Sequence, residues 1–452
     1  MSEKSYSKLF GCNIHGSIRI SPIALKIIDT PEFQRMRDIK QLGLCYQIYP
    51  AATHTRFEHS IGVYHLAGRM IEKIQQQYPN KEYDIPNIGK TKLTPIIGEC
   101  IKLAGLCHDI GHGPFSHIFD DILLQNSTHP NKHHEVRSCL ILEMLCHREL
   151  SDELNDQHIK FIKSLINPSK HHVGALYQII SNDLNGVDVD KFDYLTRDST
   201  NLGLSDGFHF DRLINEFIID ENNNIAYPKH CSVDIYEMFH KRYLMHKKVY
   251  NHKTVKIIEC MLSDIYIKID SIFKISESIK NMNTFCKLND STIFNYLAII
   301  MNPPIFLKIN LSEGQLDDLN KAHQIYDRII SRKLYQQITK ITEIPEKMVK
   351  VETYLNSFLK MMLNKYPEHF TLNDFCIVKI KIGFINENKP DPFSNVFFYN
   401  KKEDTHTFNI KKTEISGIIN SNNQEIHVQL ILKKKEFYYL TIQEFENYPK
   451  YQ

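Results

Sequence analysis

One ordered set of histidines and aspartates constrains this 452-residue chain more than any other feature. An apolar stretch with a helical pattern runs directly into the adjacent pair His108-Asp109; His59 precedes this pair and Asp190 follows it, each within its own helical pattern. Two neutral imidazoles and two carboxylates on rigid helices form a mixed nitrogen and oxygen ligand set, which suits Mn, Fe, Zn or Mg rather than a thiolate zinc site. The order therefore predicts a helical body with a divalent-metal site, whose open position would hold a water of lowered pKa.

The histidine count supports the same interpretation. The chain has 23 His and no Trp, and the His are unevenly placed. Imidazoles gathered in one stretch indicate metal binding or proton transfer, whereas the alternative is a compositional habit of a chain that is also rich in Lys, Asn and Ile. The dense stretch contains His108, His112, His117, His129, His133, His134 and His147.

Composition excludes several classes of protein. The chain has 55 Lys+Arg and 53 Asp+Glu, a formal net charge of +2, whereas duplex-binding proteins usually carry a clear basic excess. A hydrophobic share of 42% is enough for a core. We find no membrane-spanning stretch and no targeting signal, so we expect a cytoplasmic protein without a membrane partner. The ten Cys are scattered without a CxxC motif and are expected to be reduced core thiols.

Periodicity predicts a mainly α chain with a smaller C-terminal α+β lobe. Residues 8–20 suggest a hairpin, residues 79–93 a loop, and Ser-Pro or Thr-Pro pairs at 21, 30 and 94 should each start a helix, with Gly43 ending the second. Alternating segments from residue 376 onward predict strands, so we divide the chain into a helical region 1–375 and a lobe 376–452. The expected helices are 57–78, 134–147, 158–166, 172–181, 187–197, 233–273, 288–300, 313–339 and 345–364.

The contexts around the ordered His and Asp resemble the HD-domain phosphohydrolases. The nearest similarity is to the deoxynucleoside triphosphate triphosphohydrolases of the SAM- and HD-domain branch. The resemblance implies a helical HD core over 56–198, preceded by a hairpin and allosteric segment 1–55. We expect the SAM domain to be absent, because residue 8 lies where the catalytic region begins. The similar segments are IIDTPEFQRMRDIKQLG (27–43), RFEHSIGV (56–63), AGLCHDIGHGPFSHIFD (104–120), NGVDVDKFDYLTRD (185–198), MFHKRYLMHKKVYNHK (238–253) and, more weakly, DPFSNVFFY (391–399).

The resemblance implies an activity: cleavage of a dNTP into deoxynucleoside and intact triphosphate, which requires attack at the α-phosphorus. A metal, cations along the triphosphate and a group that protonates the departing 5′-oxygen are then needed. By resemblance, Fe, Mn or Zn would be held by the quartet, and Mg would accompany the triphosphate. His112 and His134 would activate water and His117 would be the general acid, although the sequence does not show which ring is protonated. The implied metal ligands are His59, His108, Asp109 and Asp190.

Further residues match substrate contacts of the family. Lys191, Tyr194 and Asp198 share one helical stripe with Asp190, and the family uses them for phosphate, sugar and 3′-hydroxyl. A tightly packed tyrosine would exclude a 2′-hydroxyl. A third helix carries a basic and aromatic stripe that would otherwise be a solvated helix face. The remaining implied substrate contacts are Gln41, Leu42, Arg56, Arg242, His246 and Tyr250.

The resemblance also implies regulation by a guanine nucleotide and assembly as a dimer or tetramer. A carboxylate can accept from guanine N1–H and N2–H₂, and an arginine can donate to O6 or N7, although the same residues could be helix caps and surface side chains. Gly11-Cys12 replaces the Asn-Asp of the family, residues 222–231 lack its clustered basic side chains, and Gln429 stands where an Arg is expected. We therefore expect a weaker second effector site. The matching positions are Lys8, Asp29, Gln34, Arg37, Arg212, Lys253 and Lys433.

Two other functions stay open at this point. A different HD-type nucleotidase or phosphodiesterase would use the same metal ligands but not the stripe of Lys191, Tyr194 and Asp198. A single-stranded nucleic-acid binder would use the lysines at 433–435, which the near-neutral net charge disfavours.

Overall fold

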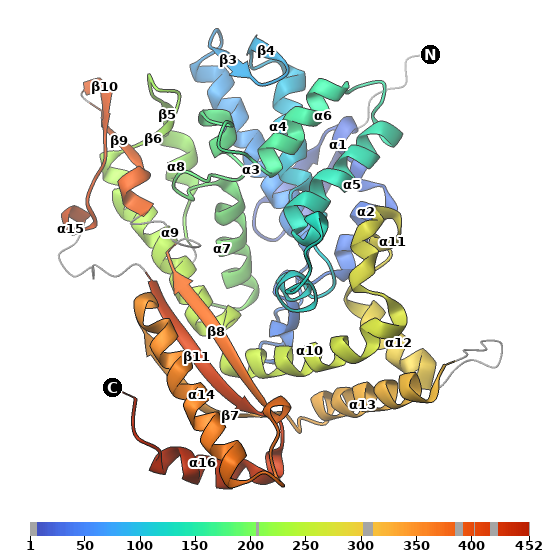
Figure 1. Cartoon of the computed structure of the whole chain (residues 1–452). Coiled ribbons are helices and arrows are strands. Elements are labelled where there is room, and N and C mark those ends of the chain that lie inside the picture. Colours follow the sequence, from blue (N-terminus) through green and yellow to red (C-terminus); the bar gives the residue numbers. More distant parts are fainter. Residues whose placement is uncertain are drawn as a thin grey trace. The chain divides into compact units, whose positions relative to one another are not determined.

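The computed structural model describes residues 7–204, 208–301, 311–384, 392–401, 403–415 and 424–451; Asp391, in one of the similar segments, lies outside them. The chain forms two compact units (Figure 1). The first unit comprises Met1–Lys241, Ser276–Ile293 and Pro390–Ile419, and the second comprises Arg242–Ile275, Phe294–Lys389 and Asn420–Gln452. This division differs from the predicted boundary after residue 375, because the chain passes repeatedly between the units.

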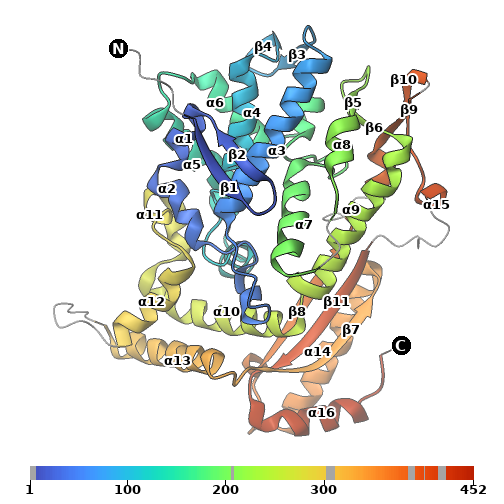
Figure 2. The ribbon, with the colours of Figure 1, turned by 180° about the vertical axis from the view of Figure 1, so that it is seen from behind.

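The first unit begins with the predicted hairpin, strands β1 (Lys8–Cys12) and β2 (Gly16–Ile20). Figure 2 shows it beside α3 (Arg56–Gln77), against which β2 packs. The predicted starts of α1 (Pro22–Ile28) and α2 (Pro31–Gln34) are confirmed, with the side chains of Ser21 and Thr30 as N-caps. The prediction that the second helix reaches Gly43 is wrong: α2 gives way to a 3₁₀ turn, Arg35–Asp38, and Gly43 opens another, Gly43–Gln47.

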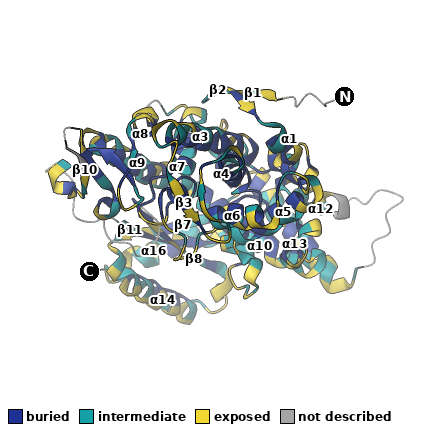
Figure 3. Ribbon diagram, turned by 90° about the horizontal axis from the view of Figure 1, so that it is seen from above, coloured by how far each residue is buried: buried dark blue, intermediate teal, exposed yellow. Residues whose placement is uncertain are grey.

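A helical core follows, in which α3 packs against α4 and α7, and α4 packs against α6. Figure 3 shows the deep burial of α3 and α4. Residues 79–93 are not a loop but the hairpin of β3 (Glu82–Ile85) and β4 (Gly89–Lys92). The helix predicted over 172–181 is wrong: only a 3₁₀ turn forms, since Gly174 has φ +104°. The other core helices are α4 (Pro95–Cys107), α5 (His134–Glu149), α6 (Asp156–Ile166), α7 (Val189–Asn201) and α8 (Asp211–Glu216).

A four-stranded sheet of order β10-β9-β6-β5 explains why residues near the C-terminus belong to the first unit. Strand β9 pairs in parallel with β6, which lies about 170 residues earlier in the sequence. The strands are β5 (Ile218–Ile219), β6 (Ile225–Pro228), β9 (Phe397–Asn400) and β10 (Glu403–Phe408), and the unit also contains the short helices α11 (Met282–Phe285) and α15 (Lys412–Ile415).

The long helix predicted over 233–273 is interrupted, and the second unit begins within this range at Arg242. Helix α9 (Ser232–Met245) leads into a π-helical turn, His246–Tyr250, and α10 (Lys253–Phe273) starts anew after His252 caps it. Helix α12 (Asp290–Met301) precedes α13 (Glu313–Ile330), which ends nine residues before the predicted limit. Arg332 follows with φ +57°, and the segment then becomes a strand.

That strand completes a three-stranded antiparallel sheet of order β7-β11-β8, which confirms the predicted β-rich tail. Inward side chains of β11 pack with α14 in an apolar core that includes Leu355, Phe358, Val428 and Leu430. Within the described residues, no helix combines the length and apolar character needed to cross a bilayer. The elements are β7 (Gln336–Glu343), α14 (Met348–Lys365), β8 (Phe375–Gly383), β11 (Gln424–Leu432) and α16 (Tyr438–Asn447).

Candidate active site and metal centre

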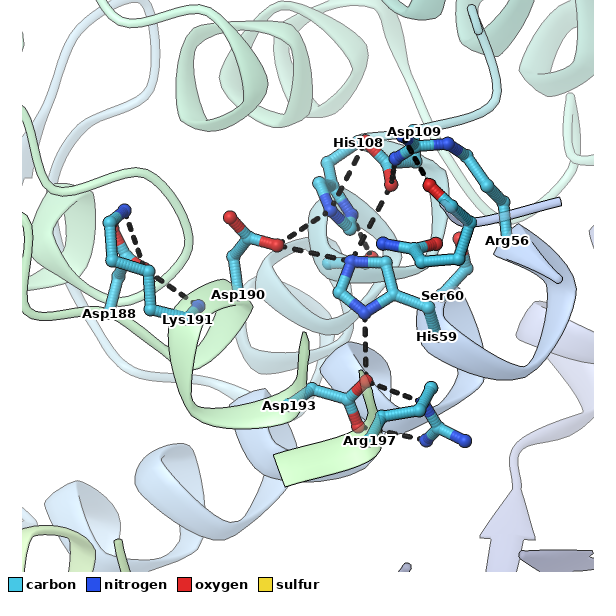
Figure 4. Close-up of polar contacts among 12 residues, drawn as sticks. Arg56, His59, Ser60, His108, Asp109, Asp188, Asp190, Lys191, Asp193 and Arg197 are labelled. Carbon is cyan, nitrogen blue, oxygen red and sulfur yellow. Dashed lines mark hydrogen bonds and ion pairs between the residues drawn. The ribbon is translucent and has the colours of Figure 1, made fainter. Parts of the chain in front are cut away.

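The four predicted metal ligands converge in the first unit (Figure 4). His59 Nε2 lies 3.1 Å from Asp190 Oδ1 and 3.5 Å from Asp109 Oδ2. His108 Nε2 lies 3.4 Å from Asp190 Oδ1 and 3.5 Å from Asp109 Oδ1. The side chain of Asp190 is 28% exposed and that of His59 1%, so the quartet is accessible from the side of Asp190.

Both histidines present the correct nitrogen for a metal. His59 Nδ1 lies 2.8 Å from Asp193 Oδ2, and His108 Nδ1 lies 2.8 Å from the Gly105 carbonyl oxygen. Each acceptor holds the ring proton on Nδ1, so each Nε2 keeps its lone pair for a cation. The two Nε2 atoms are buried and make no hydrogen bond. A divalent cation fits this donor set, since it would satisfy both nitrogens at once.

The electrostatics favour a cation at the same point. Burial alone would lower the pKa of His59, yet the carboxylates of Asp190 and Asp193 raise it to about 10. Despite the opposing effect of burial, the neighbouring histidines hold the pKa of Asp190 well below its usual range. The carboxylates thus stabilise positive charge among the predicted ligands, and a metal ion would supply that charge in place of the imidazole proton.

Local sequence explains how the ligands are positioned. The Glu58 side chain accepts a hydrogen bond from Thr55 N and fixes the start of α3, one residue before His59. Asp188 caps α7 by accepting from Lys191 N, which places Asp190 in the first helical turn. The two caps thus fix the first turns of α3 and α7, which carry His59 and Asp190.

Arg56 forms a buried ion pair with Asp109 and donates from Nε to Ser116 Oγ over 2.9 Å. Ser116 and its neighbour Phe115 both have positive φ, near +60°, which is uncommon for residues other than glycine. Asp290 accepts from Phe115 N and holds this strained loop. The loop thus fixes a guanidinium beside the ligand quartet, where a phosphate oxygen could be bound.

The three predicted catalytic histidines form one cluster. The rings of His112 and His134 stack with centroids 3.8 Å apart, and His117 meets His112 edge-on at 4.9 Å. His112 Nε2 lies 3.3 Å from Asp109 Oδ1, which joins the cluster to the metal ligands. Burial, and then the Arg56 guanidinium, lower the pKa of His112 well below its usual range and that of His117 to about 3. Both rings are therefore neutral near pH 7.

Sequence reasoning missed Asp120, which orients His134. Its Oδ2 lies 3.0 Å from both His134 Nδ1 and His134 N, and its other oxygen accepts from the buried Arg137. Despite burial, the hydrogen bond with His134 and the charge of Arg137 keep the pKa of Asp120 low. Among the clustered rings, His134 is the one whose Nδ1 faces this carboxylate, an arrangement that stabilises an imidazolium.

The predicted substrate residues of the first unit lie around the quartet. Lys191 Nζ lies 2.9 Å from Asp188 Oδ2, and the Tyr194 ring meets that of His59 edge-on with centroids 6.5 Å apart. Asp198 Oδ1 lies 2.8 Å from His54 Nε2, a buried partner that sequence reasoning also missed. The backbone N–H of Gln41 donates to the His54 carbonyl oxygen. This bond holds the predicted sugar-contact residues Gln41 and Leu42 beside His54.

The remaining predicted substrate residues lie in the second unit. Arg242 donates from Nη1 to the Gly383 carbonyl over 2.6 Å. The rings of His246 and Tyr250 meet edge-on at 4.9 Å within the π-helical turn. That turn changes the regular spacing that the sequence suggested for the stripe. Their contact with the substrate stays a prediction.

Four of the predicted effector residues lie together. Lys8 Nζ pairs with Asp29 Oδ2 at 3.1 Å, and Arg37 Nε donates to Gln34 Oε1 over 2.8 Å. Gln34 in turn donates to the Ile28 carbonyl, beside Asp29. The other three lie elsewhere in their units: Arg212 pairs with Asp234 at 3.3 Å, Lys433 pairs with Asp264 at 2.8 Å, and Lys253 is exposed at the start of α10.

Two further residues belong to the centre, and only Asp193 carried a weak sequence signal. Asp193 is one helical turn after Asp190, and the spacing i, i+3 could have marked it as a second carboxylate near the ligands. His15 lies in the turn between β1 and β2 and reaches Asp193 from 178 residues away in the sequence. Nothing in the local pattern around His15 indicates that contact.

Comparison with known proteins identifies the family of this region. The HD domain family model matches residues 56–198, which contain the four predicted metal ligands. The chain is 54% identical over 450 residues to the HD domain-containing protein L394 of Acanthamoeba polyphaga mimivirus, covering 99% of this chain and 97% of that protein. It is 34% identical to the deoxynucleoside triphosphate triphosphohydrolase SAMHD1 homolog of Dictyostelium discoideum (96% of this chain, 79% of that protein) and 30% identical to SAMHD1 of Homo sapiens (94% and 70%). The chain belongs to the SAMHD1 family of HD-domain deoxynucleoside triphosphate triphosphohydrolases and is a hydrolase acting on dNTPs.

Proposed function

We propose that the protein hydrolyses dNTPs to deoxynucleoside and inorganic triphosphate at the quartet of His59, His108, Asp109 and Asp190. The observation that carries this proposal is Asp109, whose carboxylate lies within 3.5 Å of both histidine ligands and 3.3 Å from His112 Nε2. One residue thus joins a metal site to a cluster of proton-handling rings. Such a junction suits attack of water on a phosphorus atom.

The metal in this proposal is Fe, Mn or Zn, with Mg accompanying the nucleotide. When bound, it polarises a phosphoryl oxygen and lowers the pKa of water. Arg56, held beside the quartet by Ser116, donates to phosphate oxygens. Lys191, which is partly buried at the first turn of α7, provides a second cation for the triphosphate.

The three clustered histidines transfer protons in this proposal. His112 and His134 accept the proton of the attacking water, and Asp120 stabilises the resulting charge on His134 through Nδ1. His117 donates to the departing 5′-oxygen. Because His117 is neutral without nucleotide, it must gain its proton when the anionic triphosphate approaches.

The second part of the proposal is regulation by a guanine nucleotide, with assembly into a dimer or tetramer. Lys8 and Asp29 support it, since their side chains are 55% and 52% exposed beside Gln34 and Arg37. This cluster offers an ammonium for phosphate, and a carboxylate and a guanidinium for guanine. We expect a weaker second effector site, as Gly11 and Cys12 replace the polar pair of the family.

One assay tests both parts. Each dNTP is incubated with the protein, with and without GTP, while ³¹P NMR identifies products and light scattering measures oligomer size. We expect tripolyphosphate from all four dNTPs, and faster turnover and a larger assembly with GTP. The variants Asp29→Asn and Arg37→Ala should lose the GTP response but keep basal turnover. The double variant His108→Ala/Asp109→Ala should be inactive with its fold retained.

The assay also separates the alternatives. A nucleotidase or phosphodiesterase would release phosphate or pyrophosphate instead of tripolyphosphate. A nucleic-acid binder would give a salt-dependent gel shift without turnover. Equal rates and equal oligomer size with and without GTP or dGTP would refute the regulatory part alone.

A further inference from the structure

The N-terminal hairpin reaches the metal centre through a single side chain. His15, in the turn between β1 and β2, places Nε2 2.6 Å from Asp193 Oδ1, and the two side chains are 3% and 0% exposed. Asp193 in turn holds the metal ligand His59. We propose that His15 is a positioning residue that couples the hairpin to metal binding through Asp193 and His59. This inference rests on the metal site proposed above.

The contacts of Asp193 explain why one donor matters. Figure 4 shows Asp193 between His59 and Arg197. Its Oδ2 accepts from His59 Nδ1 over 2.8 Å and from Arg197 Nε over 2.8 Å, and Oδ1 accepts from Arg197 Nη2 over 2.9 Å and from His15. An ionised carboxylate only accepts hydrogen bonds, so the orientation of its plane is set by these donors. Loss of His15 leaves Arg197 and His59 alone to hold it.

The space around Asp193 is a second, independent observation. A Cβ atom added to Gly62 of α3 would lie 1.9 Å from Asp193 Oδ1 and 2.6 Å from Arg197 Nη2. Helix α3 also carries His59, one turn earlier. Helix α3 therefore has a glycine at the position against which the Asp193 carboxylate packs, and the same carboxylate orients His59 of this helix. Such a close fit allows Asp193 little freedom once His15 is in place.

The hairpin turn is built to hold His15 in position. Cys12 Sγ accepts from His15 N over 3.4 Å and contacts Arg197 Nη2 at 3.5 Å, so the hairpin meets the Asp193 and Arg197 pair at two points. The His15 ring packs against Phe210, with centroids 5.9 Å apart. The same hairpin carries Lys8, which pairs with Asp29. A ligand that shifts the hairpin would change metal affinity, and by linkage the metal would change the affinity for that ligand.

The test measures metal affinity directly, without turnover. The full chain is stripped of metal and titrated with Mn²⁺, with free Mn²⁺ followed by EPR and the fold by circular dichroism. His15→Ala should weaken Mn²⁺ binding about 10-fold, the lower end of the effect of outer-shell partners, and Gly62→Ala should weaken it by at least as much. His15→Gln, which can donate from its own Nε2, should recover most of the loss.

Asn13→Ala is the matched control. Asn13 lies in the same turn and donates to Asn201, but does not contact Asp193. Its affinity should equal that of the wild type, and His108→Ala should bind no Mn²⁺ at this site. Equal affinities for His15→Ala, Asn13→Ala and the wild type would overturn the coupling. If His15→Ala does not fold, Gly62→Ala takes its place in the comparison with Asn13→Ala and the wild type, and equal affinities again overturn the coupling. A wild type that binds no Mn²⁺ would overturn the metal site and the coupling together.

Discussion

Gly111 packs against the first turn of α5, which carries the proposed catalytic residue His134, and Gly111→Ala should therefore lower turnover. An added Cβ would lie 2.2 Å from the His134 carbonyl oxygen and 2.4 Å from Ser138 N, both backbone atoms of α5. Backbone cannot rotate away as a side chain can. The existing bonds add resistance, since Gly111 N donates to Ser138 Oγ and Arg137 Nε donates to the Gly111 carbonyl.

The size of the shift follows from these distances. Real Cβ contacts essentially never fall below 3.0 Å, so the separation of the Gly111 segment and the start of α5 must grow by at least 0.8 Å, the difference between 3.0 and 2.2 Å. His134 begins that helix and moves with it. A misplacement of about 1 Å costs about 100-fold in rate, which corresponds to about 2.7 kcal/mol of transition-state stabilisation. Overpacking of this kind costs a further 1–3 kcal/mol or so of folding free energy.

Steady-state turnover of dNTP measures the loss of rate, and thermal unfolding measures the loss of folding free energy, each in Gly111→Ala and the wild type. Gly68→Ala is the matched control. Gly68 lies in α3, and an added Cβ would meet the flexible Lys102 side chain, with Cδ at 3.3 Å and Cγ at 3.9 Å. Alanine is favoured over glycine in a helix interior by about 1 kcal/mol. We expect wild-type turnover and equal or higher stability for Gly68→Ala. Wild-type turnover and stability in Gly111→Ala would show that the added methyl group does not displace the start of α5.

Three further predictions follow from named contacts. Asp120→Asn should lower kcat about 100-fold or more while substrate KM changes little, because His134 loses the acceptor that stabilises its proton; an unchanged kcat would exclude this role. His54→Ala should raise KM for dNTPs several-fold. This rise should be absent with 2′,3′-dideoxynucleoside triphosphates if Asp198 binds the 3′-hydroxyl. Burial, and then the charges of His15 and Arg69, lower the pKa of His65 to about 4, although Asp193 opposes this shift. Between about pH 6.5 and pH 4, the unfolded chain therefore binds a proton at His65 that the folded chain does not bind. Stability should fall as pH drops through this range, and His65→Gln should reduce that fall by on the order of 2–3 kcal/mol in urea unfolding; equal acid sensitivity of both proteins would contradict it.

The sequence predicted the helices of the first unit where caps and apolar periodicity agree. Thr94 and Pro95 start α4 as expected, and the hairpin over 8–20 formed in register. The failures have local causes. Gly174 adopts a φ that a helix cannot use. The predicted helix 313–339 included the first four residues of β7, a short strand that is defined by its pairing with β11.

The convergence of the four predicted metal ligands could be foreseen because each residue lies in a recognisable sequence context. Their partners were harder to find. Asp193 and Asp120 each lie near the Nδ1 atom of a histidine, and such a contact depends on a distance of about 3 Å between side chains rather than on spacing in the chain. His15 and His54 contact aspartates 178 and 144 residues away, and only the folded chain shows those pairs.

The central claim is that water attacks the α-phosphorus of a dNTP at this centre. Turnover of dNTP in ¹⁸O-labelled water, followed by mass spectrometry of the separated products, tests it most directly. We expect one ¹⁸O atom in each tripolyphosphate and none in the deoxynucleoside, with all turnover lost in the His108→Ala/Asp109→Ala variant. Label in the deoxynucleoside, or pyrophosphate as the labelled product, would contradict it.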